Sequence, residues 1–324
     1  MPLHSVHGLE MNKGRTRGFN GISTFGLVIF VFLLLCCACA KQQERLFADY
    51  PIKGPESHDG YRAILATTDL SVGNNRVSFV LTSPQGFVST KKLLLVVSSE
   101  IGSMEGDKYL PDFVEWNFAE RGSYVDFINF RSSGKHNAQI TFEHFDKRRH
   151  VELVFDVSKS SLSPQISQEV PQSRSRTLTD VGNVNDLSTG SLVHPNLYLI
   201  SIDEATSNMK PSIVTFTSPA FCLSEVCGPQ VEVLNQLSSS FSEKVDFIHI
   251  DIYSEPSQAQ SNIESAEYSN VFLEWGLQSP QWTFLIDCKG EVFNKYQGFV
   301  TAGEIELVVN DLLSKSEKLS GCTI

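Results

Sequence analysis

The sequence lacks the local patterns that mark several common enzyme classes. It contains no glycine-rich phosphate-binding loop, no Ser–His–Asp order of a serine hydrolase and no catalytic carboxylate pair that rises above chance. No internal repeat is present either. Nothing in these patterns indicates a cofactor, and we expect none.

Positive charge is also scarce. The 324 residues carry 26 Lys and Arg against 37 Asp and Glu, a formal net charge of −11. Lys13, Arg15 and Arg17 lie near the N-terminus, so loss of that segment makes the chain more negative still. This balance argues against nucleic acid as a partner and against electrostatic binding to anionic lipid.

The N-terminal apolar run is too short for an ordinary membrane span. Residues 25–35 follow the basic segment and end in a cysteine-rich stretch, which is typical of a signal peptide. The stretch resembles a bacterial lipoprotein signal, which implies that residues 1–39 are the signal and that Cys39 receives the lipid. The alternative is an uncleaved signal anchor with incidental cysteines. By either route we expect an exported protein held at the extracytoplasmic side of the cell membrane.

Cysteine is scarce beyond residue 39. The remaining ones are Cys222, Cys227, Cys288 and Cys322. An even number in an exported protein permits two disulfides.

The segment that follows a polar tether at residues 40–57 has the pattern of an all-β domain, which we place at 58–158. Short apolar or alternating runs occur at 61–67, 76–81, 92–97, 124–130, 138–145 and 150–157, and turn signals occur at 73–75, 83–86 and 132–134. Strands at this spacing favour an antiparallel sandwich of immunoglobulin type.

Residues 159–194 are rich in Ser, Thr, Gln, Pro and Asn and contain almost no aromatic residue. Such a composition buries too little apolar surface to offset the entropy of ordering. We therefore predict a flexible or extended linker before the last domain.

Residues 211–313 have the order strand, cysteine-bearing turn, helix, strand, long loop, helix, strand, strand, helix. The first strand, 212–216, leads through Cys222 and Cys227 into a helix with an apolar face. A thiolate at a helix N-terminus is stabilised by the helix dipole and by unpaired N–H groups. This is the only part of the sequence that indicates chemistry.

Three later features support the same architecture. A second buried strand is predicted at 245–253, Pro280 precedes the strand 282–287, and a capping box at 301–304 opens the last helix. This order of elements resembles the thioredoxin fold. We therefore expect an α/β thioredoxin-like domain at 195–316 and a C-terminal tail at 317–324, so that the whole chain is a multidomain protein.

The resemblance implies thiol–disulfide exchange with extracytoplasmic protein thiols and disulfides. Cys222 would be the attacking thiolate and Cys227 the resolving thiol. Pro280, Gln281 and Trp282 lie in the turn that faces the pair and would hold extended substrate chain. For Trp275 and Trp282, which flank this turn, core packing of at least one is the simpler alternative.

The cysteine motif departs from the family pattern in its spacing. The family usually has two residues between its redox cysteines, whereas four residues lie between Cys222 and Cys227. The wider loop can still close a disulfide, with a different geometry and potential.

Two further departures lie close to the pair. Gln281 occupies the position where the family has a cis-proline, and Pro280 comes one residue early. Thr215 stands where many thioredoxins have a buried aspartate, and Glu225 is the nearest substitute. These departures leave two interpretations open: a redox-active dithiol, or a static disulfide in a non-enzymatic binding or assembly protein.

A copper chaperone is the third interpretation, because two cysteines and a histidine suit copper. The chaperones that this fold resembles place their histidine in a loop, whereas His249 lies within a predicted strand. A hydrogen-bonded sheet histidine is the simpler interpretation, and we expect no metal.

The remaining cysteines are expected to pair. In the thioredoxin arrangement, Cys288 lies in the turn between the last two strands, and the last helix returns the chain to that end of the sheet. Cys322 follows the helix closely, so the resemblance implies a Cys288–Cys322 disulfide. The alternative is two free thiols.

The predicted lipid anchor can be tested by replacing the sulfur atom of Cys39. The variant Cys39→Ser should release or mislocalise the protein and leave the exported domains folded, because it removes the acylated sulfur. Membrane fractionation and mass spectrometry of the N-terminal peptide measure this. Unchanged membrane retention without any acyl group would exclude the lipoprotein interpretation.

Overall fold

The computed structural model describes residue 47 and residues 50–103, 105–116, 118, 121–221 and 226–323. Phe47–Ile324 form one compact unit. The N-terminal apolar run and Cys39 lie outside the described residues. Within those residues, no helix has both the length and the apolar character needed to cross a membrane.

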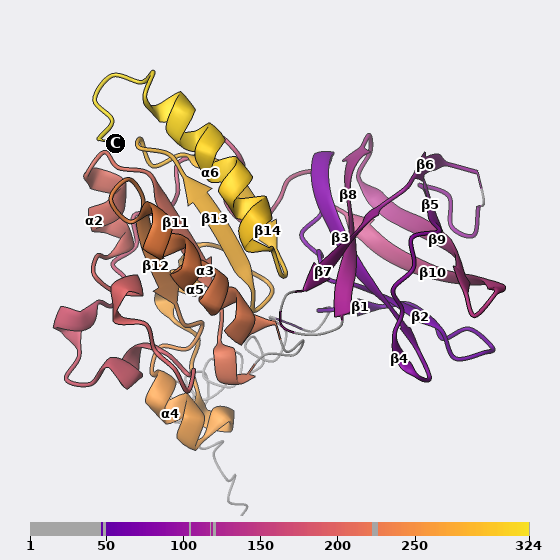
Figure 1. The fold of residues 1–324 in the computed structure, drawn as a ribbon, viewed down its shortest axis with the longest axis horizontal. Helices are drawn as coiled ribbons and strands as arrows, with labels where there is room; N and C mark the ends of the chain where they lie inside the picture. The colour runs from indigo at the N-terminus through magenta and orange to yellow at the C-terminus, as the bar shows by residue number, and fades with distance from the viewer. Residues whose placement is uncertain are drawn as a thin grey trace, which may run out of the picture. The chain divides into compact units, whose positions relative to one another are not determined.

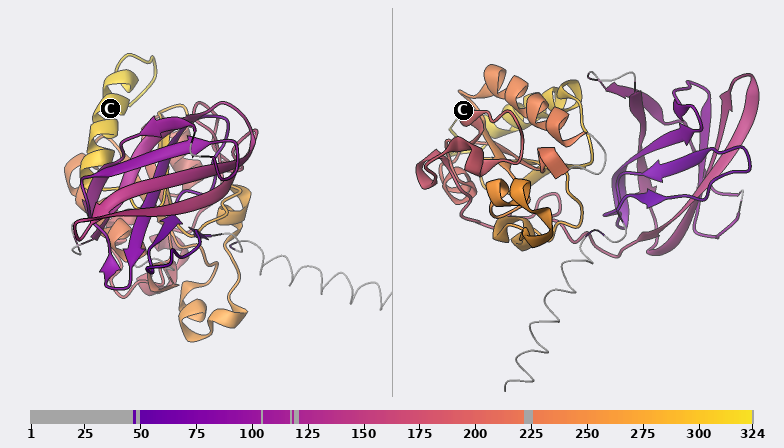
Figure 2. Two further views of the ribbon diagram at one scale, coloured as in Figure 1. Left: turned by 90° about the vertical axis from the view of Figure 1, so that its right-hand side faces the viewer. Right: turned by 90° about the horizontal axis from the view of Figure 1, so that it is seen from below.

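Residues 52–157, here called the β region, form two antiparallel sheets (Figures 1 and 2). One sheet has the order β1-β2-β3-β8-β7, with β4 paired to β3, and the other has the order β10-β9-β5-β6. The strands are β1 (Ile52–Lys53), β2 (Arg62–Leu65), β3 (Gly73–Ser83), β4 (Gly86–Phe87), β5 (Leu93–Ser98), β6 (Asp107–Tyr109), β7 (Asp112–Trp116), β8 (Arg121–Phe130), β9 (Gly134–His144) and β10 (Lys147–Val157).

The two sheets share one hydrophobic core. Alternate residues of β3, such as Val77, Phe79 and Leu81, face alternate residues of β9, such as Ile140 and Phe142, within this core. Each of the six predicted strand segments overlaps a strand of the structure. Period-two alternation is clear in β2 and β10, whereas β5 is a continuous apolar run. The strands β1, β4, β6 and β7 were not predicted.

One turn signal was misread. Residues 73–75 were predicted to form a turn, but β3 begins at Gly73. The Asn75 side chain accepts a hydrogen bond from the backbone N–H of Ser71 at 3.0 Å and donates to its carbonyl at 2.6 Å. Asn75 therefore orders the chain just before the strand, and the local bend that its composition indicates lies at residues 71–73.

The C-terminal part, here called the thioredoxin-like region (202–316), has a four-stranded sheet of order β12-β11-β13-β14. β12 runs parallel to β11, β13 runs antiparallel to β11, and β14 runs antiparallel to β13. The elements are α2 (Ile202–Ser207), β11 (Ser212–Phe216), α3 (Cys227–Phe241), β12 (Asp246–Ile250), α4 (Pro256–Ser261), α5 (Asn270–Glu274), β13 (Trp282–Ile286), β14 (Val292–Gln297) and α6 (Ala302–Ser316). This is the arrangement that the resemblance to thioredoxin predicts.

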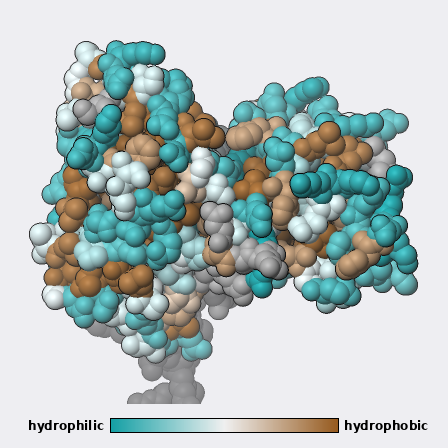
Figure 3. Space-filling view, viewed as in Figure 1, coloured by the Kyte–Doolittle hydropathy of each residue, from teal (hydrophilic) through white to brown (hydrophobic). Residues whose placement is uncertain are grey.

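Helices cover both faces of this sheet. α3 and α6 lie over one face (Figure 1), where their apolar residues pack with Ile213 and Leu285. Neighbouring strand residues point to the opposite face, where Phe216 and Phe284 contact Trp275. The predicted capping box is confirmed: Thr301 accepts from the Glu304 N–H, and the Glu304 carboxylate accepts from the Thr301 N–H. The outer surface seen in Figure 3 mixes hydrophilic and hydrophobic residues.

The segment between the two regions packs more closely than its composition predicts. It contains the 3-10 helices η1 (Leu178–Asp180), η2 (Val184–Leu187) and η3 (Pro195–Leu197). Short polar side chains, among them Ser173, Ser175 and Thr189, are buried in it. The prediction that this composition cannot bury itself is wrong here, because small hydroxyl side chains are cheap to order once each finds a hydrogen-bond partner.

The segment is also joined to the edge of the thioredoxin-like sheet. The Ser167 N–H donates to the Val292 carbonyl at 2.8 Å, and the Val292 N–H donates to the Gln168 carbonyl at 2.9 Å. Further 3-10 turns, η4 (Pro219–Phe221) and η5 (Ile263–Ser265), lie within the thioredoxin-like region itself.

The C-terminal tail is tied back to the sheet. Cys288 and Cys322, the two cysteines that the sequence analysis pairs, form a disulfide with a Cα–Cα distance of 5.5 Å. The Thr323 N–H donates to the Met209 carbonyl at 2.8 Å, so the tail also contacts the chain that enters β11.

Removing this bridge should destabilise the thioredoxin-like region. Cys322→Ser opens a loop of 34 residues, for which the chain-entropy account gives a loss of about 3–4 kcal/mol in the free energy of unfolding. Denaturant unfolding of the oxidised proteins measures it. Cys288→Ser should give a similar loss; a change below about 1 kcal/mol in both would contradict a stabilising role.

Candidate active site

The cysteine pair begins with a residue outside the described ones, Cys222, and ends with a described one, Cys227. Cys227 is the first residue of α3, is completely buried and is disulfide-bonded. Its position follows from β11, whose five residues are all buried and paired on both sides. The chain therefore leaves β11 at the carboxyl end of the strand, and α3 begins at that edge of the sheet.

The position of the missing aspartate holds a neutral pair. Thr215 is buried in β11, and its hydroxyl lies 3.1 Å from that of Thr283 on the paired strand β13. One hydroxyl donates to the other, and neither is basic enough to take a proton from a thiol as a carboxylate would. Glu225, the predicted substitute, lies outside the described residues.

A buried carboxyl does exist nearby, at a position that the sequence analysis missed. Asp251 directly follows β12 and accepts hydrogen bonds from the Thr189 N–H at 2.6 Å and the Thr189 hydroxyl at 2.8 Å. Burial raises the pKa of Asp251 to about 6, despite hydrogen bonds from Thr189, Tyr253 and Ser218 that lower it. The sequence could have indicated this site, because Asp251 is an acidic residue at the end of a predicted buried strand. Its partner Thr189 could not be predicted, because it lies in the segment that we expected to be a flexible linker.

The same network reaches the cysteine-bearing turn. The Thr189 hydroxyl lies 2.8 Å from that of Ser218 and accepts from the Ala220 N–H at 3.3 Å. Ala220 belongs to η4, the last described element before Cys222. Asp251 therefore helps to hold the start of the turn in place through Thr189.

His249 is a hydrogen-bonded sheet histidine. Its Nδ1 lies 2.5 Å from the Tyr198 hydroxyl and its Nε2 lies 3.2 Å from the Thr217 carbonyl. Because the carbonyl can only accept, Nε2 carries the proton and Nδ1 accepts from Tyr198. Complete burial lowers the pKa of His249 to about 4. No group of three or more metal-ligating residues occurs in the described part of the chain.

The predicted substrate turn, residues 280–282, lies next to α3, the helix that begins at Cys227 and is here called the dithiol helix. Gln281 Nε2 donates to Gln230 Oε1 at 3.4 Å, and that oxygen also accepts from the Val300 N–H at 3.0 Å. Gln230 lies one turn after Cys227 on α3, so the turn and the cysteine share one neighbourhood. Among the described residues, the only cis peptide bond is Tyr50–Pro51, so Pro280 is trans.

The three predicted substrate-binding residues are all buried. Gln281 is 0% and Trp282 is 2% exposed, and Pro280 is buried as well. Trp275 is equally buried and contacts Phe216 and Phe284, so both tryptophans pack in the core, as the simpler interpretation expects. Whether the turn holds substrate remains a prediction.

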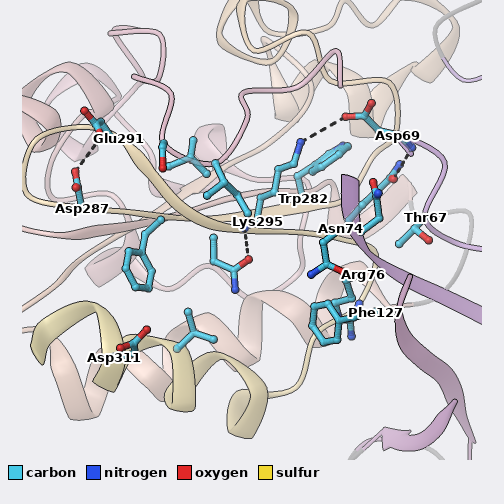
Figure 4. A pocket seen from close by; sticks show the side chains of 18 of the residues that line it. Thr67, Asp69, Asn74, Arg76, Phe127, Trp282, Asp287, Glu291, Lys295 and Asp311 are labelled. Carbon is cyan, nitrogen blue, oxygen red and sulfur yellow. Dashed lines mark hydrogen bonds and ion pairs between the residues drawn. The ribbon is translucent and has the colours of Figure 1, made fainter. Parts of the chain in front are cut away.

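A cavity of about 500 Å³ lies beside this turn, between β14, α6 and the β region (Figure 4). The Lys295 ammonium group is directed toward Asp69 at 3.8 Å, bonds the Ser161 and Ser163 hydroxyls at 2.6 and 2.8 Å, and lies 5.7 Å from the Trp282 ring. Burial lowers the pKa of Lys295, and Asp69 opposes that effect. The protein itself balances these charges, so the cavity lining indicates no particular ligand.

No family model and no curated protein matches this sequence. Among solved structures, the chain is similar to a thioredoxin-family thiol:disulfide interchange protein from Chlorobium tepidum, with 15% identity and a TM-score of 0.27 over 33% of this chain and 81% of that one. It is also similar to a candidate protein disulfide isomerase from Bacteroides thetaiotaomicron, with 17% identity and a TM-score of 0.33 over 48% and 94%. The fold is assigned here from strand order and direction, because similarity at this level supports no inference about function.

His249 and Asp251 should oppose each other in the pH dependence of stability. Between pH 6.5 and about 4, the unfolded state binds a proton at residue 249 that the folded state does not, so acidification destabilises the fold. Between about pH 6 and 3.8, the folded state binds the extra proton at Asp251, so acidification stabilises it. In His249→Asn only the second effect remains.

Denaturant unfolding at pH 6 and pH 4.5 measures this. Relative to the wild type, the free energy of unfolding of His249→Asn should rise by up to about 2 kcal/mol on acidification, since one pKa unit corresponds to about 1.4 kcal/mol. The exposed His150→Asn serves as the control and should follow the wild type. If the free energy of unfolding changed by the same amount between pH 6 and pH 4.5 in all three proteins, residue 249 would not titrate as proposed.

Proposed function

We propose that this protein exchanges disulfides with extracytoplasmic proteins through Cys222 and Cys227. The observation that carries the proposal is the place of Cys227: it is disulfide-bonded at the first residue of the helix that follows the central strand of a thioredoxin-like sheet. The helix N-terminus favours a thiolate there. No cofactor is required, because the electrons move between sulfur atoms.

The reaction has two balanced steps. The Cys222 thiolate attacks one sulfur of a partner disulfide, forms a mixed disulfide and releases the partner's other sulfur as a thiolate. The Cys227 thiolate then attacks the Cys222 sulfur and releases the partner's second thiolate. The partner gains two electrons, and the Cys222–Cys227 disulfide forms; the reverse sequence oxidises a partner dithiol.

The proposed location is the extracytoplasmic face of the membrane, with a lipid on Cys39. The basic segment, the short apolar run and the cysteines that end it support this location. A disulfide between Cys288 and Cys322 suits an oxidising compartment.

The β region is proposed to be an immunoglobulin-like sandwich. Its neighbours β2, β3, β8 and β7 correspond in order to strands A, B, E and D of that fold, and β10, β9 and β5 correspond to G, F and C. The common core of the two sheets supports the same reading. As a module it would act as a spacer or bind a partner.

A non-enzymatic binding or assembly protein with a static disulfide is the second candidate. The spacing of four residues, the neutral Thr215–Thr283 pair and the trans Pro280 favour it. A copper chaperone has less support, since both ring nitrogens of His249 are already engaged.

A trapping experiment separates the two candidates. In Cys227→Ser the mixed disulfide on Cys222 cannot be resolved, so exchange activity predicts covalent adducts with exported proteins, seen on non-reducing gels. Cys222→Ser is the matched control and should trap nothing. After reduction of the wild type, Cys222 should also alkylate faster than the buried Cys227 at neutral pH, because its pKa should lie below the ordinary value of about 8.5.

A second set of results would favour the non-enzymatic candidate. Equal, slow alkylation of both thiols and the absence of adducts in Cys227→Ser would favour the static disulfide. A reduction potential below about −300 mV would agree with that outcome, since structural disulfides lie in this range.

A further inference from the structure

The turn expected to hold substrate is buried in this structure. Ser279, Gln281 and Trp282 are at most 2% exposed. An extended polypeptide could not lie along them without displacing the groups that cover them. Ser279 is covered by Gln297 of β14, which the β region holds in place. Trp282 lines the cavity of Figure 4 together with Thr67 and Asp69 of the β region.

The first contact runs through one side chain, Gln297, at the end of β14. Its Oε1 accepts from the backbone N–H groups of Thr68 and Asp69 at 2.7 and 2.9 Å. Its Nε2 donates to the Thr68 and Ser279 hydroxyls, both at 2.8 Å. Gln297 therefore links the β region directly to the predicted substrate turn.

The second contact is aromatic. Trp116, the last residue of β7, is 7% exposed, and its ring centroid lies 5.8 Å from that of Phe299. The Phe118 ring lies 5.3 Å from the same residue in an edge-on arrangement. Phe299 precedes Val300, whose N–H is bound by Gln230 of the dithiol helix. The β region thus places an aromatic pair one residue away from a direct contact of that helix.

The third contact is an ion pair between a buried arginine and a partly exposed glutamate. Arg76 of β3 bonds the Glu304 carboxylate at 2.8 Å and is only 5% exposed. Its Nη2 also donates to the Phe299 carbonyl at 3.5 Å, and its Nη1 is buried without a partner. An unsatisfied buried donor costs about 1–3 kcal/mol, which offsets part of what this ion pair contributes to the interface.

The interface between these contacts is incompletely filled. The cavity of about 500 Å³ in Figure 4 is bordered by Asp69 and Arg76 on the β region and by Trp282 and Lys295 on the thioredoxin-like region. A permanent core is close-packed, whereas this interface joins polar contacts, an aromatic pair and a cavity. Such a composition is typical of surfaces that separate and dock again.

We propose that the β region is an intramolecular cap on the substrate groove, and that an unfolded polypeptide gains access to residues 279–282 when the cap lifts. The inference concerns regulation of the site and rests on the proposed function for its biological meaning. Capping lowers the apparent affinity for substrate by the fraction of molecules that are open. Loosening the cap should therefore raise that affinity.

The test measures binding without redox chemistry. The probe is reduced, carboxamidomethylated α-lactalbumin, an unfolded chain without free thiols. Trp116→Ala removes the aromatic contact. Arg76→Gln breaks the ion pair without exposing aromatic surface, and it provides an independent test if Trp116→Ala does not fold. Both should bind the probe at least fivefold more tightly than the wild type. Phe145→Ala, which removes an exposed aromatic at the β9–β10 turn, should bind like the wild type.

Hydrogen exchange locates the binding. The amides of Ser279, Gln281 and Trp282 should exchange faster in the two loosened variants and become protected when the probe is added; Pro280 has no amide hydrogen. Unchanged affinity in the folded variants, or protection elsewhere in the chain, would overturn the cap. Turnover of a small disulfide is measured in parallel: if no protein shows any, the proposed exchange activity fails, while the binding result still decides the cap.

Discussion

The two-sided pairing of β11 is the constraint on which the candidate site depends. β12 pairs with it in parallel and β13 in antiparallel register, and all five of its residues are buried. The chain must therefore leave the sheet at one edge, where Cys227 opens α3 and where Asp251 follows β12. The groups of the site gather there because neighbouring parallel strands end at the same edge.

Two neutral pairs lie close to α3 in the part of the chain that the structure describes. Thr215 pairs with Thr283, and Gln230 of α3 pairs with Gln281. The nearest buried carboxyl, Asp251, reaches the cysteine-bearing turn only through Thr189.

Sequence reasoning recovered what local periodicity and capping encode. Six strands of the β region and the capping box at Thr301 follow from patterns within a few residues, whereas β1, β4, β6 and β7 were not predicted. The arrangement of the thioredoxin-like elements followed from their order together with the resemblance to the thioredoxin fold. Sequence reasoning failed where partners are distant in the chain. Thr189 meets Asp251 across 62 residues, and Gln297 meets Thr68 across 229. No spacing in the sequence indicates such contacts, because they depend on how finished elements pack.

The burial of the predicted substrate turn bears on whether the domain is a working oxidoreductase or a binding domain with a static disulfide. A trans Pro280 and a buried Gln281 would both suit a domain that has lost turnover and keeps the turn only as packing. In such a domain, however, the surface over the turn has no reason to stay polar and hollow, since apolar packing there would be at least as stable. Gln297, the Arg76–Glu304 pair and the cavity are the features of this interface from which the cap is proposed. The proposed cap gives these polar contacts a role in covering and uncovering the turn, whether or not the disulfide turns over.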